Sequence, residues 1–95
     1  MKFDQKCKAI RADDVNASDT LSIMYKVRDA FNSVDRNIYE VFVHTDECLI
    51  VDTIDKYDNF YRIGEPLSKL GLYISSFETK SYATGGSRFW IKTIN

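Results

Sequence analysis

The sequence has few of the residues that interrupt, crosslink or add metal ligands to a fold. Its 95 residues include one proline, four glycines, two cysteines and one histidine. Cys7 and Cys48 cannot form a CxxC pair or a four-cysteine zinc site. No signal-peptide pattern follows Met1, so we expect a cytoplasmic chain with both thiols free. The longest apolar run, 48–51, is far short of the roughly 20 residues of a membrane span, so we expect no membrane partner.

Net charge is nearly absent as well. The chain contains 13 lysines and arginines and 14 acidic residues, while 44% of it is hydrophobic and 14% is aromatic. This composition excludes an intrinsically disordered chain and gives no support to non-specific nucleic-acid binding by bulk charge. We expect a single domain over residues 1–95. One asymmetry stands out, because residues 79–95 contain Lys80, Arg88 and Lys92 but no acidic side chain.

Hydrophobic spacing predicts seven elements. Apolar residues recur every three or four positions over 18–33, which is typical of an amphipathic helix. A second helix begins near Gly64 and ends before Gly71, which is suited to the position after a helix C-terminus. Strands are expected at 2–10, 38–43, 48–53, 72–80 and 88–94, and the segment 54–63 fits neither pattern well.

The element order β-α-β-β-α-β-β predicts an α+β fold, with an antiparallel-rich sheet and two helices on one face. Its first six elements match the ferredoxin-like pattern, in which the last strand would be an added C-terminal edge strand. Since residues 49–51 are apolar on both parities, the strand 48–53 is expected inside the sheet. If the last hairpin turns at Gly85-Gly86, Phe77 and Thr79 share a face with Trp90.

No metal site is predicted. His44 stands near Asp46 and Glu47, but this group resembles the polar tip of a hairpin more than a zinc site. Acidic residues at 52, 55 and 58 lack the spacing and the glycine of a calcium loop. We expect no metal and no cofactor.

No catalytic motif is recognised, so we predict that the protein is not an enzyme. Cys48 lies near His44, but it opens an apolar strand, where burial raises a thiol pKa and reduces reactivity. The segment Thr84–Arg88 combines glycines, hydroxyls and a guanidinium, which leaves a small anionic ligand or nucleotide as an alternative. It lacks the spacing of a P-loop.

The last strand is the most informative stretch. Arg88, Trp90 and Lys92 share one face, an arrangement suited to stacking on a nucleic-acid base or to anchoring a protein interface. The alternative places Trp90 in the core with the cations at its margin. The candidate binding residues of this hairpin are Lys80, Tyr82, Arg88, Trp90 and Lys92.

These observations favour a small non-catalytic protein that binds another protein, for example a regulator or inhibitor of phage or mobile-element type. The first alternative is nucleic-acid binding through the basic-aromatic C-terminal hairpin. The second is anion or nucleotide binding at Thr84–Arg88. We expect a monomer or a homodimer, because an unpaired edge strand invites pairing with a second chain.

Overall fold

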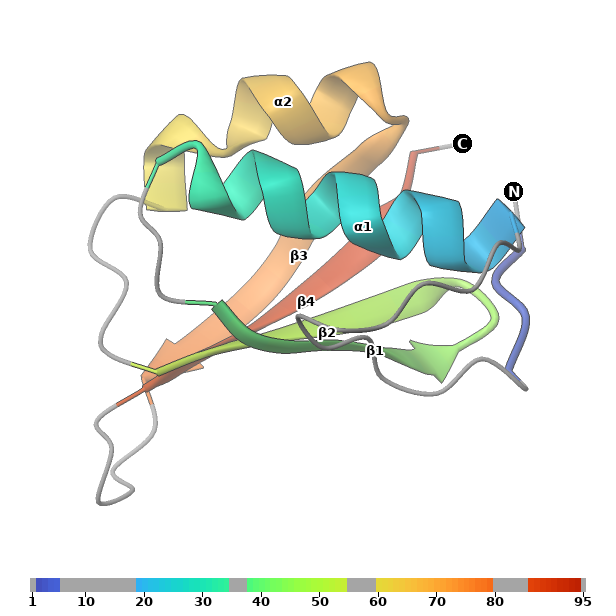
Figure 1. The fold of residues 1–95 in the computed structure, drawn as a ribbon, viewed down its shortest axis with the longest axis horizontal. Helices are drawn as coiled ribbons and strands as arrows, with labels where there is room; N and C mark the ends of the chain where they lie inside the picture. The colour runs from blue at the N-terminus through green and yellow to red at the C-terminus, as the bar shows by residue number, and fades with distance from the viewer. Residues whose placement is uncertain (1, 6–18, 35–37, 55–59, 80–85, 95) are drawn as a thin grey trace.

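The computed structural model describes residues 2–5, 19–34, 38–54, 60–79 and 86–94, without the side chains at 38, 39 and 60. Its described strands form a four-stranded antiparallel sheet, and both helices lie on one face of that sheet (Figure 1). This arrangement confirms the predicted α+β class with two helices on one face.

The elements follow the predicted order from the first helix onward. They are α1 (Asp19–Asn32), β1 (Ile38–Thr45), β2 (Cys48–Thr53), the 3-10 helix η1 (Phe60–Arg62), α2 (Gly64–Lys69), β3 (Leu72–Thr79) and β4 (Ser87–Thr93). The spacing of Met24, Val27 and Phe31 puts all three on the buried stripe of α1. Gly71 follows α2 with φ of 74°, a conformation that favours glycine and confirms its predicted place.

The strand order, β1-β2-β4-β3, corrects the expected position of the last strand. The prediction of an added C-terminal edge strand is wrong, because β4 pairs with both β2 and β3. Apolar side chains on both of its faces, Phe89 and Ile91 on one and Trp90 on the other, suit an interior strand. The ferredoxin-like topology is not confirmed.

The chain before α1 also differs from its prediction. Lys2–Gln5 is not a strand, and residues 6–10 lie outside the described part of the chain. Phe3 is nonetheless buried, and its N–H donates to the Asp46 carbonyl at 2.7 Å. The Asp4 N–H donates to the Thr20 hydroxyl at 2.8 Å, so this segment joins the β1–β2 turn to the start of α1.

The register of the last hairpin corrects a second prediction. Thr79 pairs with Ser87, and Phe77 pairs with Phe89 rather than sharing a face with Trp90. The pairing of Thr79 with Ser87 does not fit a two-residue turn centred on Gly85-Gly86, which the prediction assumed. Ser75 is also an extra residue in β3, because Ile74 lies opposite Ile91 whereas Ser76 lies opposite Trp90.

The main core lies between the helices and the sheet. Phe89 is fully buried there, and its ring meets the Phe31 ring edge to face at a centroid distance of 5.3 Å. Leu49 and Val51 of β2 face the same core. Ile50, on the opposite face of β2, is only 2% exposed, so the prediction of an interior strand at 48–53 is confirmed.

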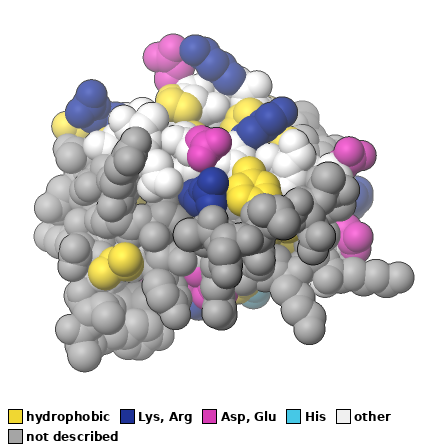
Figure 2. All heavy atoms as spheres, viewed as in Figure 1, with side chains coloured by type: hydrophobic (Ala, Val, Ile, Leu, Met, Phe, Trp, Pro, Cys, Tyr) yellow, Lys and Arg dark blue, Asp and Glu magenta, His cyan; other side chains and the backbone are white. Residues whose placement is uncertain are grey.

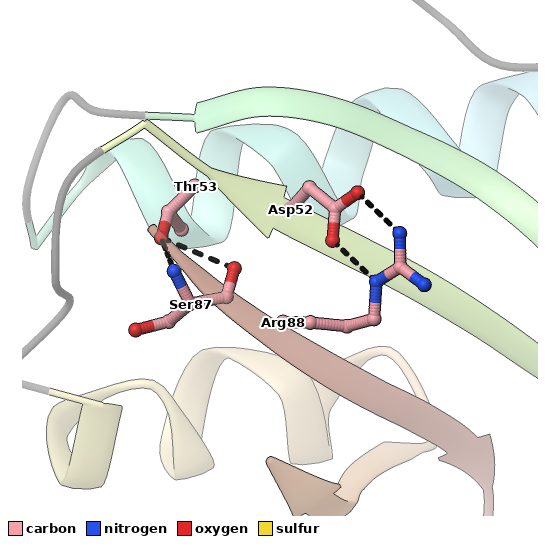
Figure 3. Close-up of polar contacts among 4 residues, drawn as sticks. All are labelled: Asp52, Thr53, Ser87 and Arg88. Atoms are coloured by element: carbon pink, nitrogen blue, oxygen red, sulfur yellow. Dashed lines mark hydrogen bonds and ion pairs between the residues drawn. The ribbon is translucent and has the colours of Figure 1, made fainter. Parts of the chain in front are cut away.

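One buried junction aligns the end of β2 with the start of β4. The Ser87 N–H donates to the Thr53 hydroxyl at 2.9 Å, and that hydroxyl donates to the Ser87 carbonyl at 3.3 Å (Figure 3). Gly86, next to Ser87, packs directly against the Thr53 backbone. The two strands therefore meet backbone to backbone, with a buried hydroxyl satisfying both groups of Ser87.

Candidate protein-docking edge

The residues predicted from the last strand lie on the sheet face opposite the helices. Arg88 is opposite Asp52, and its guanidinium binds both carboxylate oxygens at 2.7 and 2.8 Å (Figure 3). The same guanidinium lies 5.5 Å from the centre of the Phe42 ring. Both side chains of this ion pair are more than two-thirds buried. The positive charge of Arg88 is therefore neutralised within the protein.

Trp90 and Lys92 continue the same row. Trp90 is half-buried between Ile50 of β2 and Ser76 of β3, whereas Lys92 is exposed. Trp90 thus belongs neither to the helix-facing core nor to a fully exposed surface. The other two candidates, Lys80 and Tyr82, lie outside the described residues.

Of the predicted anion loop Thr84–Arg88, the structure describes only residues 86–88, because residues 84 and 85 lie outside the described part. Ser87 is 2% exposed and gives its N–H to Thr53, while Arg88 is paired with Asp52. Both donors that an anion would need from this end of the loop already have partners.

Cys48 is buried and His44 is exposed, so the two side chains that were considered and rejected as a nucleophile–base pair lie in different environments. Burial raises the pKa of the Cys48 thiol, an effect partly offset by the charge of Lys92. Among the described residues, no three potential metal ligands are grouped together. In that same part of the chain, no helix is long and apolar enough to cross a membrane.

The Cys48 thiol should therefore react slowly in the folded protein. In a Cys7→Ser variant, which isolates Cys48, we expect iodoacetamide at pH 8 to react at least about tenfold more slowly than after unfolding in urea. Because the folded pKa is raised, the contribution of Cys48 to stability is complete below the unfolded pKa and is lost as pH rises through the folded pKa. Equal alkylation rates with and without urea would contradict the burial of this thiol.

The feature that sequence reasoning missed is the edge at β3. The described large hydrophobic side chains that remain exposed are Ile54, Tyr61, Tyr73, Phe77 and Ile94. All of them except Ile54 line one groove of about 600 Å³ that runs along β3 and reaches Gly64 and Ser68 of α2. Figure 1 shows β3 beneath α2, at the border of the sheet.

The side chains of this groove are continuous with the core. Phe77 is 46% exposed, yet its ring stacks on buried Phe89 at a centroid distance of 5.8 Å. Tyr61, contributed by η1, is 72% exposed. Contacts with the core therefore restrict the apolar side chains of the groove before a partner binds. Such preorganised side chains lose little conformational entropy on binding and are suited to anchor an interface.

The backbone of β3 also faces the groove. The Ile94 N–H donates to the Gly71 carbonyl at 2.8 Å, which marks these residues as a hydrogen-bonded pair. Because antiparallel pairs alternate, the N–H and C=O groups of Leu72 and Ile74 point away from β4. In the described part of the chain no strand lies beyond β3, so these groups line the open border of the sheet.

A larger groove of about 890 Å³ lies between α1 and α2, but its character is different. Its lining includes the cations Lys26, Arg62 and Lys69 and the carboxylates Asp29 and Glu65. The Lys69 Nζ lies 3.4 Å from the Glu65 Oε1, and both side chains of this ion pair are exposed. Figure 2 shows positive and negative side chains interspersed over this part of the surface. This groove has the character of a solvated helical surface.

The sequence did contain a signal for the β3 edge, but this signal has a meaning only once the strand order is known. The segment 72–79 has no lysine, arginine or proline, the residues that commonly protect an edge strand. Once β4 is known to be interior, that segment becomes an edge. No protein-family model, curated protein or solved structure matches this chain.

Proposed function

We propose that this protein acts by binding another polypeptide chain, which adds an extended strand to β3 within the groove beside α2. The observation that carries the proposal is the concentration of exposed apolar side chains in this groove. An edge strand and a helix that flank an apolar groove suit recognition by strand addition. In that mode backbone hydrogen bonds supply affinity, and pockets for alternate side chains supply specificity.

The groove offers both kinds of contact. Leu72 and Ile74 present backbone groups to the border, and Tyr61, Phe77 and Ile94 present apolar side chains. The predicted row on the other face gives less support to an anionic partner, because Asp52 neutralises Arg88. A polypeptide is therefore the partner that the described surface supports best.

We expect the double variant Tyr61→Ser/Ile94→Ser to lose most of the partner that the tagged wild-type chain retains from its host, about tenfold or more. Both side chains are over half exposed, so the variant should keep its melting temperature. Ile54→Ser is the matched control, because Ile54 is 46% exposed and lies outside the groove. Retention is measured by quantitative mass spectrometry.

A second measurement locates the contact in the reconstituted complex. Amide hydrogen exchange should slow at Leu72 and Ile74 when the purified partner is added. If the double variant retains the same partner as the wild type, or these two amides exchange unchanged, docking at β3 is ruled out.

A further inference from the structure

We propose that the chain which β3 binds is a second copy of this protein, joined antiparallel about a two-fold axis between Ser75 and Ser76. This inference rests on the proposed function and names the occupant of the same edge. Four described features support it: the register of β3, the direction of its backbone groups, its exposed apolar side chains and its charges.

The extra residue in β3 changes which side chains share a face. In a regular strand, residues three positions apart point to opposite faces. Ser75 breaks that alternation, so Ile74, opposite Ile91, and Phe77, opposite Phe89, both point toward the helices. Tyr73 and Glu78, opposite Lys92 and Arg88 respectively, both point to the other face.

This change makes β3 complementary to itself. With the axis between Ser75 and Ser76, Ile74 of one copy lies opposite Phe77 of the other. In the same register Tyr73 lies opposite Glu78. Residues opposite one another in antiparallel strands share a face, and both pairs meet that condition. In a regular strand, Ile74 and Phe77 would point to opposite faces of the sheet, and so would Tyr73 and Glu78. This register would then place each side chain opposite one that points to the other face.

The backbone and the apolar side chains suit this register. Because the N–H and C=O groups of Ile74 point to the border of the sheet, they are directed at the second copy. Phe77 and Tyr73, at 46% and 44% exposed, would be covered by its strand. An aromatic ring beside a β-branched side chain is a favourable cross-strand pair.

The charges are complementary across the same axis. Glu78 of one copy faces the neutral ring of Tyr73 in the other, and Lys92 is the next residue along that row. The Glu78 carboxylate of each copy therefore approaches Lys92 of the other copy, which lies one strand beyond Tyr73. No two side chains of like charge are neighbours in this row. An isologous contact repeats this arrangement twice.

The experiment measures mass and exchange on the full chain. Sedimentation equilibrium from micromolar to millimolar concentration should show a monomer–dimer equilibrium. Amide exchange at Leu72 and Ile74 should slow as the concentration rises. Glu78→Lys should weaken dimerisation by about tenfold or more, because it brings a third cation near Lys92 and Arg88. The charge exchange Glu78→Lys/Lys92→Glu should restore much of the loss.

Asp29→Lys is the control, because it makes the same change in charge on α1 at a side chain that is 71% exposed. Melting temperatures verify that each variant folds. A monomer at every concentration would overturn the second-copy inference. So would a dimer that Glu78→Lys leaves unchanged.

The two proposals fail in different ways. If the chain is monomeric but the Tyr61→Ser/Ile94→Ser variant still loses a partner, only the second-copy inference fails. If no copy pairs at β3 and no partner depends on the groove, the proposed function fails with it. Partner capture and self-association are measured separately, so the two results can be told apart.

Discussion

Phe89→Ala is expected to reduce the free energy of unfolding by about 3–5 kcal/mol, the range for removing a buried aromatic side chain. Phe89 is fully buried at the centre of the sheet, between the rings of Phe31 and Phe77. Its removal therefore leaves a cavity and ends the ring contacts with Phe31 and Phe77. A small domain has roughly 5–15 kcal/mol in total, so the variant should be close to unfolding at 37 °C.

Phe77→Ala is the control for this experiment. It removes the same side chain from the other end of the Phe77–Phe89 stack, but at a site that is 46% exposed. We expect a loss of only about 1–2 kcal/mol, because about half of the Phe77 side chain is already exposed and the stack on Phe89 is lost. Urea denaturation followed by circular dichroism measures both variants. Similar losses would show that Phe89 is not the centre of the core.

Gly86→Ala is expected to cost about 2–4 kcal/mol, because the new methyl group has no room. A Cβ at this position would lie far inside the contact distance of the Thr53 carbonyl oxygen, and 3.1 Å from that of Ile54. Both obstacles are backbone atoms, so no side-chain rotation relieves the clash. The strands would have to separate where Ser87 and Thr53 exchange hydrogen bonds.

Gly64→Ala separates this effect from the general effect of adding a methyl group. Gly64 opens α2, and a Cβ there would meet no atom within 4 Å from the described residues outside its own helix turn. Alanine also has a higher helix propensity, so we expect a neutral or slightly stabilising change, up to about 1 kcal/mol. Thermal melts of both variants provide the comparison. A stable Gly86→Ala protein would contradict the close approach of β2 and β4.

Most of the elements could be predicted from local sequence patterns. Periodic apolar residues such as Met24, Val27 and Phe31 identify a helix with one buried stripe. A glycine in the right place, Gly71, identifies where α2 ends. These signals lie within a few residues of one another, and the structure follows them closely from α1 to β4.

The strand order and the candidate site could not be predicted in the same way. Leu49 pairs with Ile91, and no local pattern reports a contact between residues so far apart in the chain. The extra residue at Ser75 also reverses the face of every residue on one side of it, which moved Phe77 away from Trp90. The β3 edge remained hidden because an edge is a property of the whole sheet. The prediction of a regulator or inhibitor stays a prediction.

The interior position of β4 has a consequence for synthesis on the ribosome. The β1–β2 hairpin and α1 emerge early, but among the described strands β3 has no neighbour until Ser87–Thr93 follows it. The core likewise lacks Phe89 and Ile91 until that moment. The strand that joins the two halves of the sheet is therefore the last of the described elements to be synthesised, and the nascent chain should acquire protease resistance only after residue 93 has left the exit tunnel.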